Sequence, residues 1–163
     1  MTSFYSRQLP QWLIAMTLAF SPISQAETDT DAVVALFDGW RAAVERGDKE
    51  AYLAGLHEDI SLRPPGVAGL DGRDNYRAFL GPVFETAEYQ ITVDTPPSVT
   101  LMGDSAIVEY DYTITMTVIA GSEDALPEGA LTANTTTSHY IDVAQKDASG
   151  AWKVRLHSWS VTQ

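Results

Sequence analysis

The chain has 163 residues, with 10 Lys and Arg against 22 Asp and Glu, a formal net charge of −12 and no cysteine. This length suits one domain with one hydrophobic core, and the lack of cysteine excludes a disulfide framework. So acidic a surface repels phosphate backbones and anionic membranes, which argues against nucleic-acid binding. Such acidity is typical of proteins that must stay soluble in an exported compartment. The alternative explanation is that the acidic surface attracts a cationic partner.

The start of the chain predicts a cleavable signal peptide. Arg7 is the only charged residue before position 27, and residues 12–20 (WLIAMTLAF) are almost wholly apolar. Ser24 and Ala26 then supply the small–x–small pattern that signal peptidase recognises. A membrane anchor is the alternative, but a spanning helix needs about 20 apolar residues, roughly twice this run. We expect cleavage after Ala26, a periplasmic or secreted location, and one domain over residues 27–163.

Helical patterns come first in that domain. The first apolar stripe, with spacing i, i+3, i+4, i+7 and i+11, consists of Val33, Leu36, Phe37, Trp40 and Val44. Asp48 is a typical N-cap for a short second helix. Ile60 and Leu62 then alternate with polar residues and predict a short strand that Pro64-Pro65 ends. A third helical stripe covers residues 76–84.

From residue 88 onward the apolar period changes to two, which predicts strands. The expected strands are residues 89–94, 99–102, 105–118, 131–146 and 152–161. Gly103-Asp104 and residues 147–150 predict hairpin turns between them. Helices followed by antiparallel strands indicate the α+β class, with the helices covering one face of the sheet.

Several short stretches, taken in order, carry a family likeness. They are Arg46-Gly47-Asp48, 56–62 (LHEDISL), Gly72-Arg73, 103–106 (GDSA), 140–143 (YIDV), 150–152 (GAW) and Trp159-Ser160. In this order and spacing the chain resembles the nuclear transport factor 2-like superfamily, especially its SnoaL-like and ketosteroid-isomerase-like members. The resemblance implies a cone-shaped fold, with three N-terminal helices packed on a strongly curved antiparallel sheet and a pocket at the open end. Members include isomerases, cyclases, dehydratases and non-catalytic association domains, so the fold alone assigns no activity.

Carried over position by position, the resemblance argues against the ketosteroid isomerase mechanism. Those enzymes place their general-base Asp directly before a Pro, where this chain has Pro64, and their first-helix oxyanion-hole Tyr corresponds to Trp40. Their second oxyanion-hole residue, an Asp in an I-D-V strand, is matched by Asp142. Many SnoaL-like relatives carry two histidines on the last strand, where this chain has Leu156 and Ser158.

The resemblance also implies which side chains line the pocket. The aromatic ligand pocket consists of Trp40, Val44, Phe79, Tyr110, Tyr112, Tyr140 and Trp159. One polar wall beside it consists of Asp142, Arg155 and His157. The expected ligand is a small, partly apolar molecule.

The last hairpin predicts how the polar wall is arranged. If Lys146 pairs with Ala151 across a four-residue loop, Asp142 faces Arg155, and His157 is a diagonal neighbour of Asp142. Directly opposed Cβ atoms lie about 4.5–5.5 Å apart, close enough for a charge-assisted hydrogen bond. If the pair were exposed, it would be an ordinary surface contact. The resemblance instead places the pair inside the cone. In an enzyme, His157 would be the acid or base, Asp142 its orienter, and Arg155 a clamp for a developing oxyanion or carboxylate.

Two functions remain open at this point. One is a small-molecule-binding domain, with or without proton-transfer chemistry of the isomerase, cyclase or dehydratase type. The other is a non-catalytic homodimeric association module, for which the strip His139, Ile141 and Val143 on the opposite strand face would form the contact. The three histidines lack metal-ligand spacing and no cofactor-binding motif is present, so we expect neither metal nor cofactor.

Overall fold

The computed structural model describes residues 25–121, 126–131 and 133–162. The predicted signal peptide lies outside these residues, except for Gln25 and Ala26, which begin the first helix. Among the described residues, no helix combines the length and apolar character needed to cross a membrane.

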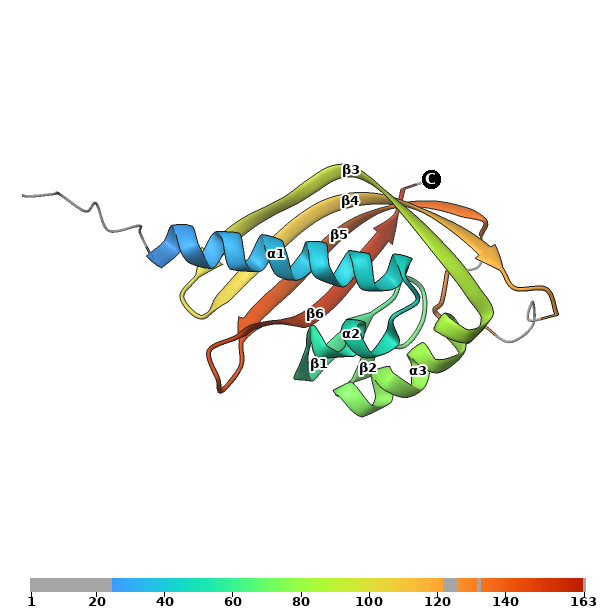
Figure 1. The fold of residues 1–163 in the computed structure, drawn as a ribbon, viewed down its shortest axis with the longest axis horizontal. Helices are drawn as coiled ribbons and strands as arrows, with labels where there is room; N and C mark the ends of the chain where they lie inside the picture. The colour runs from blue at the N-terminus through green and yellow to red at the C-terminus, as the bar shows by residue number, and fades with distance from the viewer. Residues whose placement is uncertain (1–24, 122–125, 132, 163) are drawn as a thin grey trace, which may run out of the picture.

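Three helices and six strands build the domain (Figure 1). The helices are α1 Gln25–Glu45, α2 Lys49–Ala54 and α3 Arg73–Thr86. The strands are β1 Leu56–Arg63, β2 Leu70–Asp71, β3 Ala87–Met102, β4 Ser105–Val118, β5 Thr135–Lys146 and β6 Trp152–Val161. They form one sheet in the order β2-β1-β6-β5-β4-β3. The predicted α+β cone is confirmed, with one difference: β1 runs parallel to β6, while the other neighbours are antiparallel.

Helix α1 lies along the inner face of the curved sheet (Figure 1). It buries one stripe of side chains, namely Val33, Phe37, Trp40 and Ala43. Phe37 packs edge-on against Tyr110 of β4, with ring centroids 5.6 Å apart. Near its start, Asp29 accepts hydrogen bonds from Lys146 Nζ at 3.0 Å and from Trp152 Nε1 at 3.1 Å. Packing and these polar contacts therefore hold α1 to the sheet along most of its length.

The third strand is longer than the sequence pattern predicts. Residues 89–94 and 99–102, expected as separate strands, belong to the single strand β3, which bends over the molecule (Figure 1). The pairing with β4 shifts register between Val93 and Thr95 and again between Thr95 and Ser98. Pro96-Pro97 falls in this irregular part. Because β3 is an edge strand, prolines and bulges are tolerated there without ending the strand.

The hairpin of β5 and β6 contains an irregularity that determines which of its side chains reach the site. Lys146 pairs with Trp152 rather than with Ala151, and the register shifts again between Val143 and Ala144. Ala144 pairs with Val154 and Val143 pairs with Leu156, which leaves Arg155 as an extra residue on β6. Such a bulge changes which side of the sheet the following residues face. The predicted opposition of Asp142 and Arg155 is therefore wrong.

Candidate functional site

A pocket of about 120 Å³ lies between α1, α3 and the inner face of the sheet. Each of the seven side chains predicted for the ligand pocket lines it: Trp40, Val44, Phe79, Tyr110, Tyr112, Tyr140 and Trp159. His157 lines it as well. The structure therefore gathers the predicted aromatic residues around one cavity and adds the imidazole of β6 to its wall.

Asp142 lies behind this wall and is 0% exposed. The Tyr110 hydroxyl donates to Oδ2 at 2.8 Å, and the backbone N–H of Ser158 donates to Oδ1 at 2.9 Å. His157 Nδ1 lies 2.9 Å from Oδ2 and 3.1 Å from Oδ1. The Tyr110 hydroxyl and the Ser158 N–H donate to the carboxylate, whose oxygens accept hydrogen bonds. The contact from His157 therefore needs a hydrogen on Nδ1, and we assign the imidazole proton to that atom.

The imidazole of His157 is held on several sides. Its ring stacks near-parallel on Tyr140 with centroids 5.6 Å apart, meets Trp40 edge-on at 4.8 Å and lies 5.1 Å from Trp159. Its side chain is 12% exposed. With Nδ1 turned toward Asp142, Nε2 lies on the far side of the ring from the carboxylate. That nitrogen has a free lone pair and is the basic atom of the site.

The tyrosines of the pocket are neutral hydrogen-bonding groups. Burial, followed by the charge of Asp142, raises the pKa of Tyr110 well above its usual value. The same two causes, in the same order, raise the pKa of Tyr140. Burial raises the pKa of Tyr112 to about 12. At neutral pH each of these hydroxyls keeps its proton, and each can donate it in a hydrogen bond.

A second pair of tyrosines joins two helices at the pocket. The hydroxyls of Tyr52 on α2 and Tyr76 on α3 lie 2.9 Å apart, both residues are buried, and both line the pocket. Only one hydroxyl hydrogen fits between two oxygens, so the other hydrogen of the pair is available to a further acceptor. Burial raises the pKa of both groups. The pair therefore presents a neutral O–H donor.

Four buried polar atoms around the pocket have no hydrogen-bond partner within the described structure. They are Trp40 Nε1, Arg41 Nε, the Tyr112 hydroxyl and Trp159 Nε1. Buried polar groups in proteins are nearly always paired, so a cluster of exceptions calls for an explanation. All four can donate a hydrogen bond. A ligand that brings acceptors into the pocket would satisfy them.

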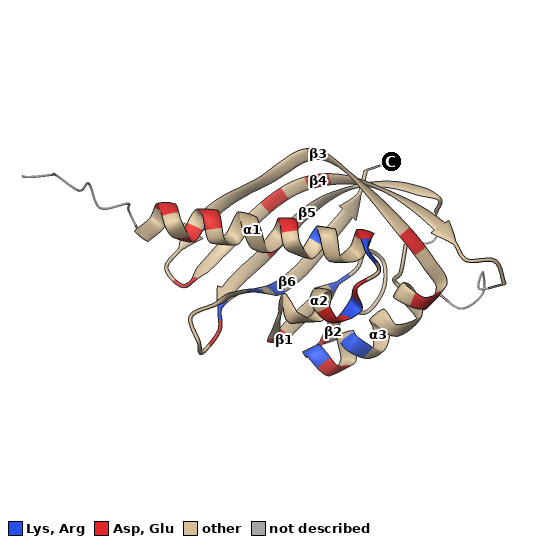
Figure 2. Cartoon of the chain, in the orientation of Figure 1, with Lys and Arg blue, Asp and Glu red and all other residues tan. Residues whose placement is uncertain are grey.

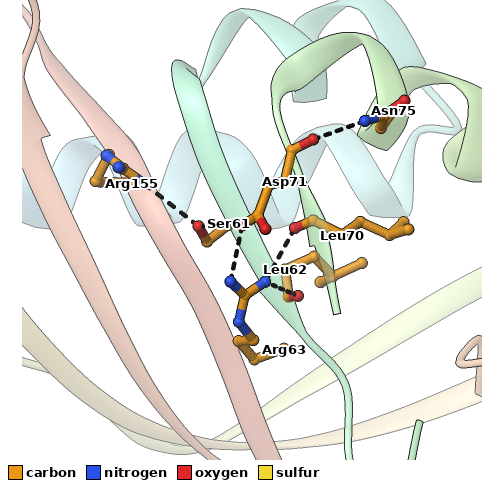
Figure 3. A network of polar contacts seen from close by, with 7 residues as sticks. All are labelled: Ser61, Leu62, Arg63, Leu70, Asp71, Asn75 and Arg155. Atoms are coloured by element: carbon orange, nitrogen blue, oxygen red, sulfur yellow. Dashed lines mark hydrogen bonds and ion pairs between the residues drawn. The ribbon is translucent and has the colours of Figure 1, made fainter. Parts of the chain in front are cut away.

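Arg155, predicted for the polar wall, lies outside the pocket. Its Nη1 is 3.4 Å from the hydroxyl of Ser61 on β1, which in turn donates to Asp71 Oδ1 at 2.7 Å (Figure 3). Arg63 Nη2 donates to the same carboxylate oxygen at 2.8 Å. The hydrogen bonds from Ser61 and then Arg63 lower the pKa of Asp71. Arg155 thus joins a polar network across β6, β1 and β2 and does not line the pocket.

A second aspartate–histidine pair lies on the other face of the sheet. His139 Nδ1 is 2.8 Å from Asp111 Oδ1, and the two side chains are 38% and 34% exposed. This agrees with the prediction that His139 faces away from Asp142. The chain therefore carries two chemically similar pairs, one enclosed beside the pocket and one open to solvent.

Sequence reasoning missed three polar residues of the pocket. Tyr76 was expected only as a member of the third helical stripe, and neither Tyr52 nor Arg41 was identified as a pocket residue. A tyrosine in a buried helical stripe needs a partner for its hydroxyl, and that need is the signal that could have marked Tyr52 and Tyr76. Arg41 follows Trp40 directly and is flanked by Asp38 and Glu45, so it resembles an ordinary surface ion pair.

Charge is unevenly distributed around this site. Figure 2 shows acidic residues along α1 and on β3 and β4, whereas most basic residues gather around α2, α3 and the neighbouring strands. Among the described residues that line the pocket there is no Asp or Glu, although the chain carries a formal charge of −12. The basic side chains of this lining are Arg41 and His157.

Comparisons with solved structures show many proteins of the same fold. A candidate dehydratase of the NTF2-like family from Streptomyces avermitilis is 19% identical with a TM-score of 0.67, covering 85% of this chain and 99% of that chain. A candidate aromatic ring hydroxylase from Novosphingobium aromaticivorans is 20% identical with a TM-score of 0.66, covering 83% and 90%. A ketosteroid isomerase-like protein from Erwinia carotovora atroseptica is 22% identical with a TM-score of 0.63, covering 82% and 95%. At such identities the likeness shows the fold alone.

A search of curated protein sequences found no match. The sequence profile of the SnoaL-like domain, in contrast, matches residues 33–154, which extend from α1 into β6. This match covers most of the chain and includes most of the residues that line the pocket. The chain therefore belongs to the SnoaL-like domain family and has the fold of the nuclear transport factor 2-like superfamily.

Proposed function

We propose that this protein binds a small, partly apolar ring compound in its aromatic pocket and catalyses proton transfer on it, with His157 as the base. One observation carries the proposal. The fully buried Asp142 holds Nδ1 of a histidine that lines the pocket. The remaining nitrogen, Nε2, is thereby oriented as a proton acceptor, in the way that a carboxylate orients the histidine of a catalytic triad.

The burial of Asp142 supports a functional reading over a purely structural one. A buried carboxylate costs several kcal/mol of desolvation unless hydrogen bonds offset it, and well-packed apolar residues would serve stability as well. Here Tyr110, Ser158 and His157 all contact the carboxylate. Such an enclosed and fully bonded charge beside a cavity is typical of a functional site.

The proposed reaction begins at a carbon next to a carbonyl group. His157 Nε2 takes a proton from that carbon, and the electron pair of the broken C–H bond moves to the carbonyl oxygen. The free O–H of the Tyr52–Tyr76 pair and other pocket donors stabilise the resulting oxyanion. The imidazolium then returns the proton to another carbon, which is an isomerisation, or to a hydroxyl group on the next carbon, which leaves as water.

The proposed catalytic groups differ from the general base and the oxyanion-hole residue of the ketosteroid isomerases. Pro64 stands at the position of the general-base Asp, and Trp40 stands at that of the oxyanion-hole Tyr. In this protein the base comes from β6 rather than β1. Trp40 instead packs between Tyr52, with ring centroids 4.6 Å apart, and His157, at 4.8 Å.

The size of the pocket supports a ring-sized ligand. An apolar cavity of about 150 Å³ accommodates benzene, and the pocket here measures about 120 Å³. Its walls include the faces and edges of several aromatic rings, which pack well on a planar ligand. Proteins of similar fold include a candidate dehydratase and a candidate aromatic ring hydroxylase; these activities describe those proteins and are not assigned to this chain.

Hydrogen–deuterium exchange tests this proposal without knowledge of the natural substrate. Phenylacetone in heavy water exchanges its acidic C–H hydrogens slowly, and the protein should accelerate that exchange. His157→Gln should lose about 10²–10⁴-fold of the acceleration, the usual contribution of a general base. His139→Gln is the matched control, because it removes the histidine of the exposed pair and should leave the rate unchanged. Equal rates for wild type and His157→Gln would refute the base assignment.

The second candidate function is a non-catalytic homodimeric association module. Ile141 is 47% exposed on the sheet face opposite Asp142, and its neighbours His139 and Val143 are only partly buried. This exposed apolar strip favours a protein contact on that face. The two functions are compatible, since the strip and the pocket lie on opposite faces of β5.

A further inference from the structure

Two of the unpartnered donors lie on different walls of the pocket, Arg41 on α1 and Tyr112 on β4. We propose that they form a subsite for an oxyanion, so that the ligand is a small ring compound carrying a carboxylate or phenolate oxygen. This inference rests on the proposed function, because it assumes that the ligand binds in this pocket. It adds the chemical class of the ligand and the residues that select it.

The contacts of Arg41 leave one edge of its guanidinium free. Nη1 donates to Glu45 Oε2 at 2.7 Å, and Nη2 lies 3.9 Å from Asp38 Oδ1. Nε is buried and has no partner in the described structure. Glu45 therefore holds Nη1 by a hydrogen bond and Asp38 lies at ion-pair distance from Nη2, while the Nε–H remains for a pocket ligand. Because a guanidinium stays charged, a hydrogen bond from it is charge-assisted.

Tyr112 supplies a neutral donor close to this cation. Its hydroxyl is buried without a partner. Burial raises the pKa of Tyr112 to about 12; the charge of Arg41 opposes that rise, and the charges of Asp38, Asp142 and Glu45 add to it. One charged and one neutral donor lining the same pocket are a typical arrangement for binding an anionic oxygen.

The electrostatics of the whole lining agree with an anionic ligand. In the described part of the chain, no carboxylate lines the pocket, and Asp142 behind it already receives three contacts. A cationic ligand would find no free carboxylate there. An anionic one would enter a site that contains Arg41, whose Nε is one of the four unpartnered donors. The acidic exterior of the protein does not extend into its pocket.

The position of the subsite sets the size of the ligand. Tyr112 and His157 lie on β4 and β6, and Tyr140 of β5 lies between them with ring centroids 5.8 Å from Tyr112 and 5.6 Å from His157. A ligand that contacts both ends therefore extends across the Tyr140 ring, as a ring compound with a substituent can. We expect one oxygen at Arg41 and Tyr112 and the reacting carbon near Nε2 of His157.

Binding of benzoate and of its uncharged analogue benzamide tests the subsite, with dissociation constants measured by NMR titration at neutral pH. Wild-type protein should bind benzoate about tenfold more tightly, since a charge-assisted hydrogen bond is worth about one order of magnitude more in affinity than a neutral one. Arg41→Met should abolish the preference and keep the apolar stem of the side chain. Tyr112→Phe should weaken both probes, because the hydroxyl donates to either carbonyl oxygen. Arg46→Met, at an exposed arginine just after α1, is the control and should keep the preference.

The outcomes separate this inference from the proposed function. Equal binding of the two probes to wild type, or a preference that survives in Arg41→Met, would overturn the oxyanion subsite and leave the role of His157 standing. Failure of both probes to bind wild type would overturn the ring-sized ligand pocket and the subsite together. A tenfold preference that only Arg41→Met removes, with Arg46→Met unchanged, supports the assignment.

Discussion

The Oδ2 atom of Asp142 lies 2.9 Å from Nδ1 of His157, and neither partner has free access to water on that side, because Asp142 is 0% exposed. The pair bridges β5 and β6. Two features make it possible: Lys146 pairs with Trp152 rather than with Ala151, and Arg155 is an extra residue on β6. In the observed register Asp142 stands opposite His157, whereas in an unbroken ladder from Lys146 and Ala151 it would stand opposite Arg155. The turn and the bulge together thus determine which side chain meets the buried carboxylate.

Replacing Asp142 by Asn should destabilise the protein strongly. The amide would place N–H groups against the donors Tyr110, Ser158 and His157, and at least one buried polar atom would lose its partner. We expect a loss of about 2–4 kcal/mol in the free energy of unfolding, measured with urea. The control Asp111→Asn changes the half-exposed pair with His139 and should cost less than about 1 kcal/mol. Similar losses for the two variants would contradict the enclosed geometry of Asp142.

Arg155 should be independent of Asp142. Its guanidinium contacts Ser61 on the far side of β6 from the pocket, at a distance of 3.4 Å that makes only a weak bond. Arg155→Met should therefore change the free energy of unfolding by less than about 1 kcal/mol. Combined with Asp142→Asn, its effect should be additive within about 0.5 kcal/mol. A coupling energy well above that value would show that the two side chains interact after all.

The family resemblance suggested which side chains line the pocket, and the periodicity of the elements agrees with the observed orientation of several of them. Tyr110 and Tyr112 follow the period of β4, which has the predicted bounds, and Trp40 follows the helical period of α1. Arg155 was misplaced because a bulge changes the parity of a strand. None of Val154, Arg155 or Leu156 signals it, since no glycine marks the position.

Other differences between the predicted and the observed structure have equally specific causes. Arg41 lies beside the apolar stripe of its helix, and its neighbouring carboxylates give it the pattern of an exposed ion pair although its Nε is buried. Residues 89–94 and 99–102 were expected as two strands, but Pro96-Pro97 between them falls on an edge strand that accommodates prolines within a bulged region. Both features depend on tertiary position, which local sequence patterns do not contain.

The buried tyrosines predict how stability responds to alkaline pH. The pKa of Tyr89 and of Tyr112 is raised from 10.0 to about 12 by burial. Between these values the unfolded chain releases protons that the folded chain retains, so the contribution of these tyrosines to stability is constant below about pH 10 and falls as pH rises toward 12. Near-ultraviolet absorbance of tyrosinate should therefore rise together with loss of the folded signal in circular dichroism. Ionisation of most tyrosines near pH 10 in a protein that stays folded would contradict their burial.

A homodimer through the outer face of the sheet remains a prediction. Ile141 is 47% exposed there, beside His139 and Val143. Ile141→Lys would place a charge in the middle of this strip and should convert the dimer to monomer at tens of micromolar, as measured by sedimentation velocity. Glu109→Lys, which changes an exposed charge on the neighbouring strand directly opposite Ile141, tests whether charge alone explains the effect. A wild-type protein that sediments as a monomer would remove the association module from consideration.

The tautomer of His157 tests the central claim most directly. If Asp142 accepts the Nδ1 proton, nitrogen NMR of isotope-labelled histidine should show the proton on Nδ1 and a free lone pair on Nε2. Asp142→Asn should disturb this state, whereas Asp111→Asn on the outer face should not. Adding benzoate should shift the Nε2 signal as the ligand fills the pocket beside it. A proton on Nε2 of His157 in the wild-type protein would contradict the account, because that nitrogen would then have no lone pair with which to act as a base.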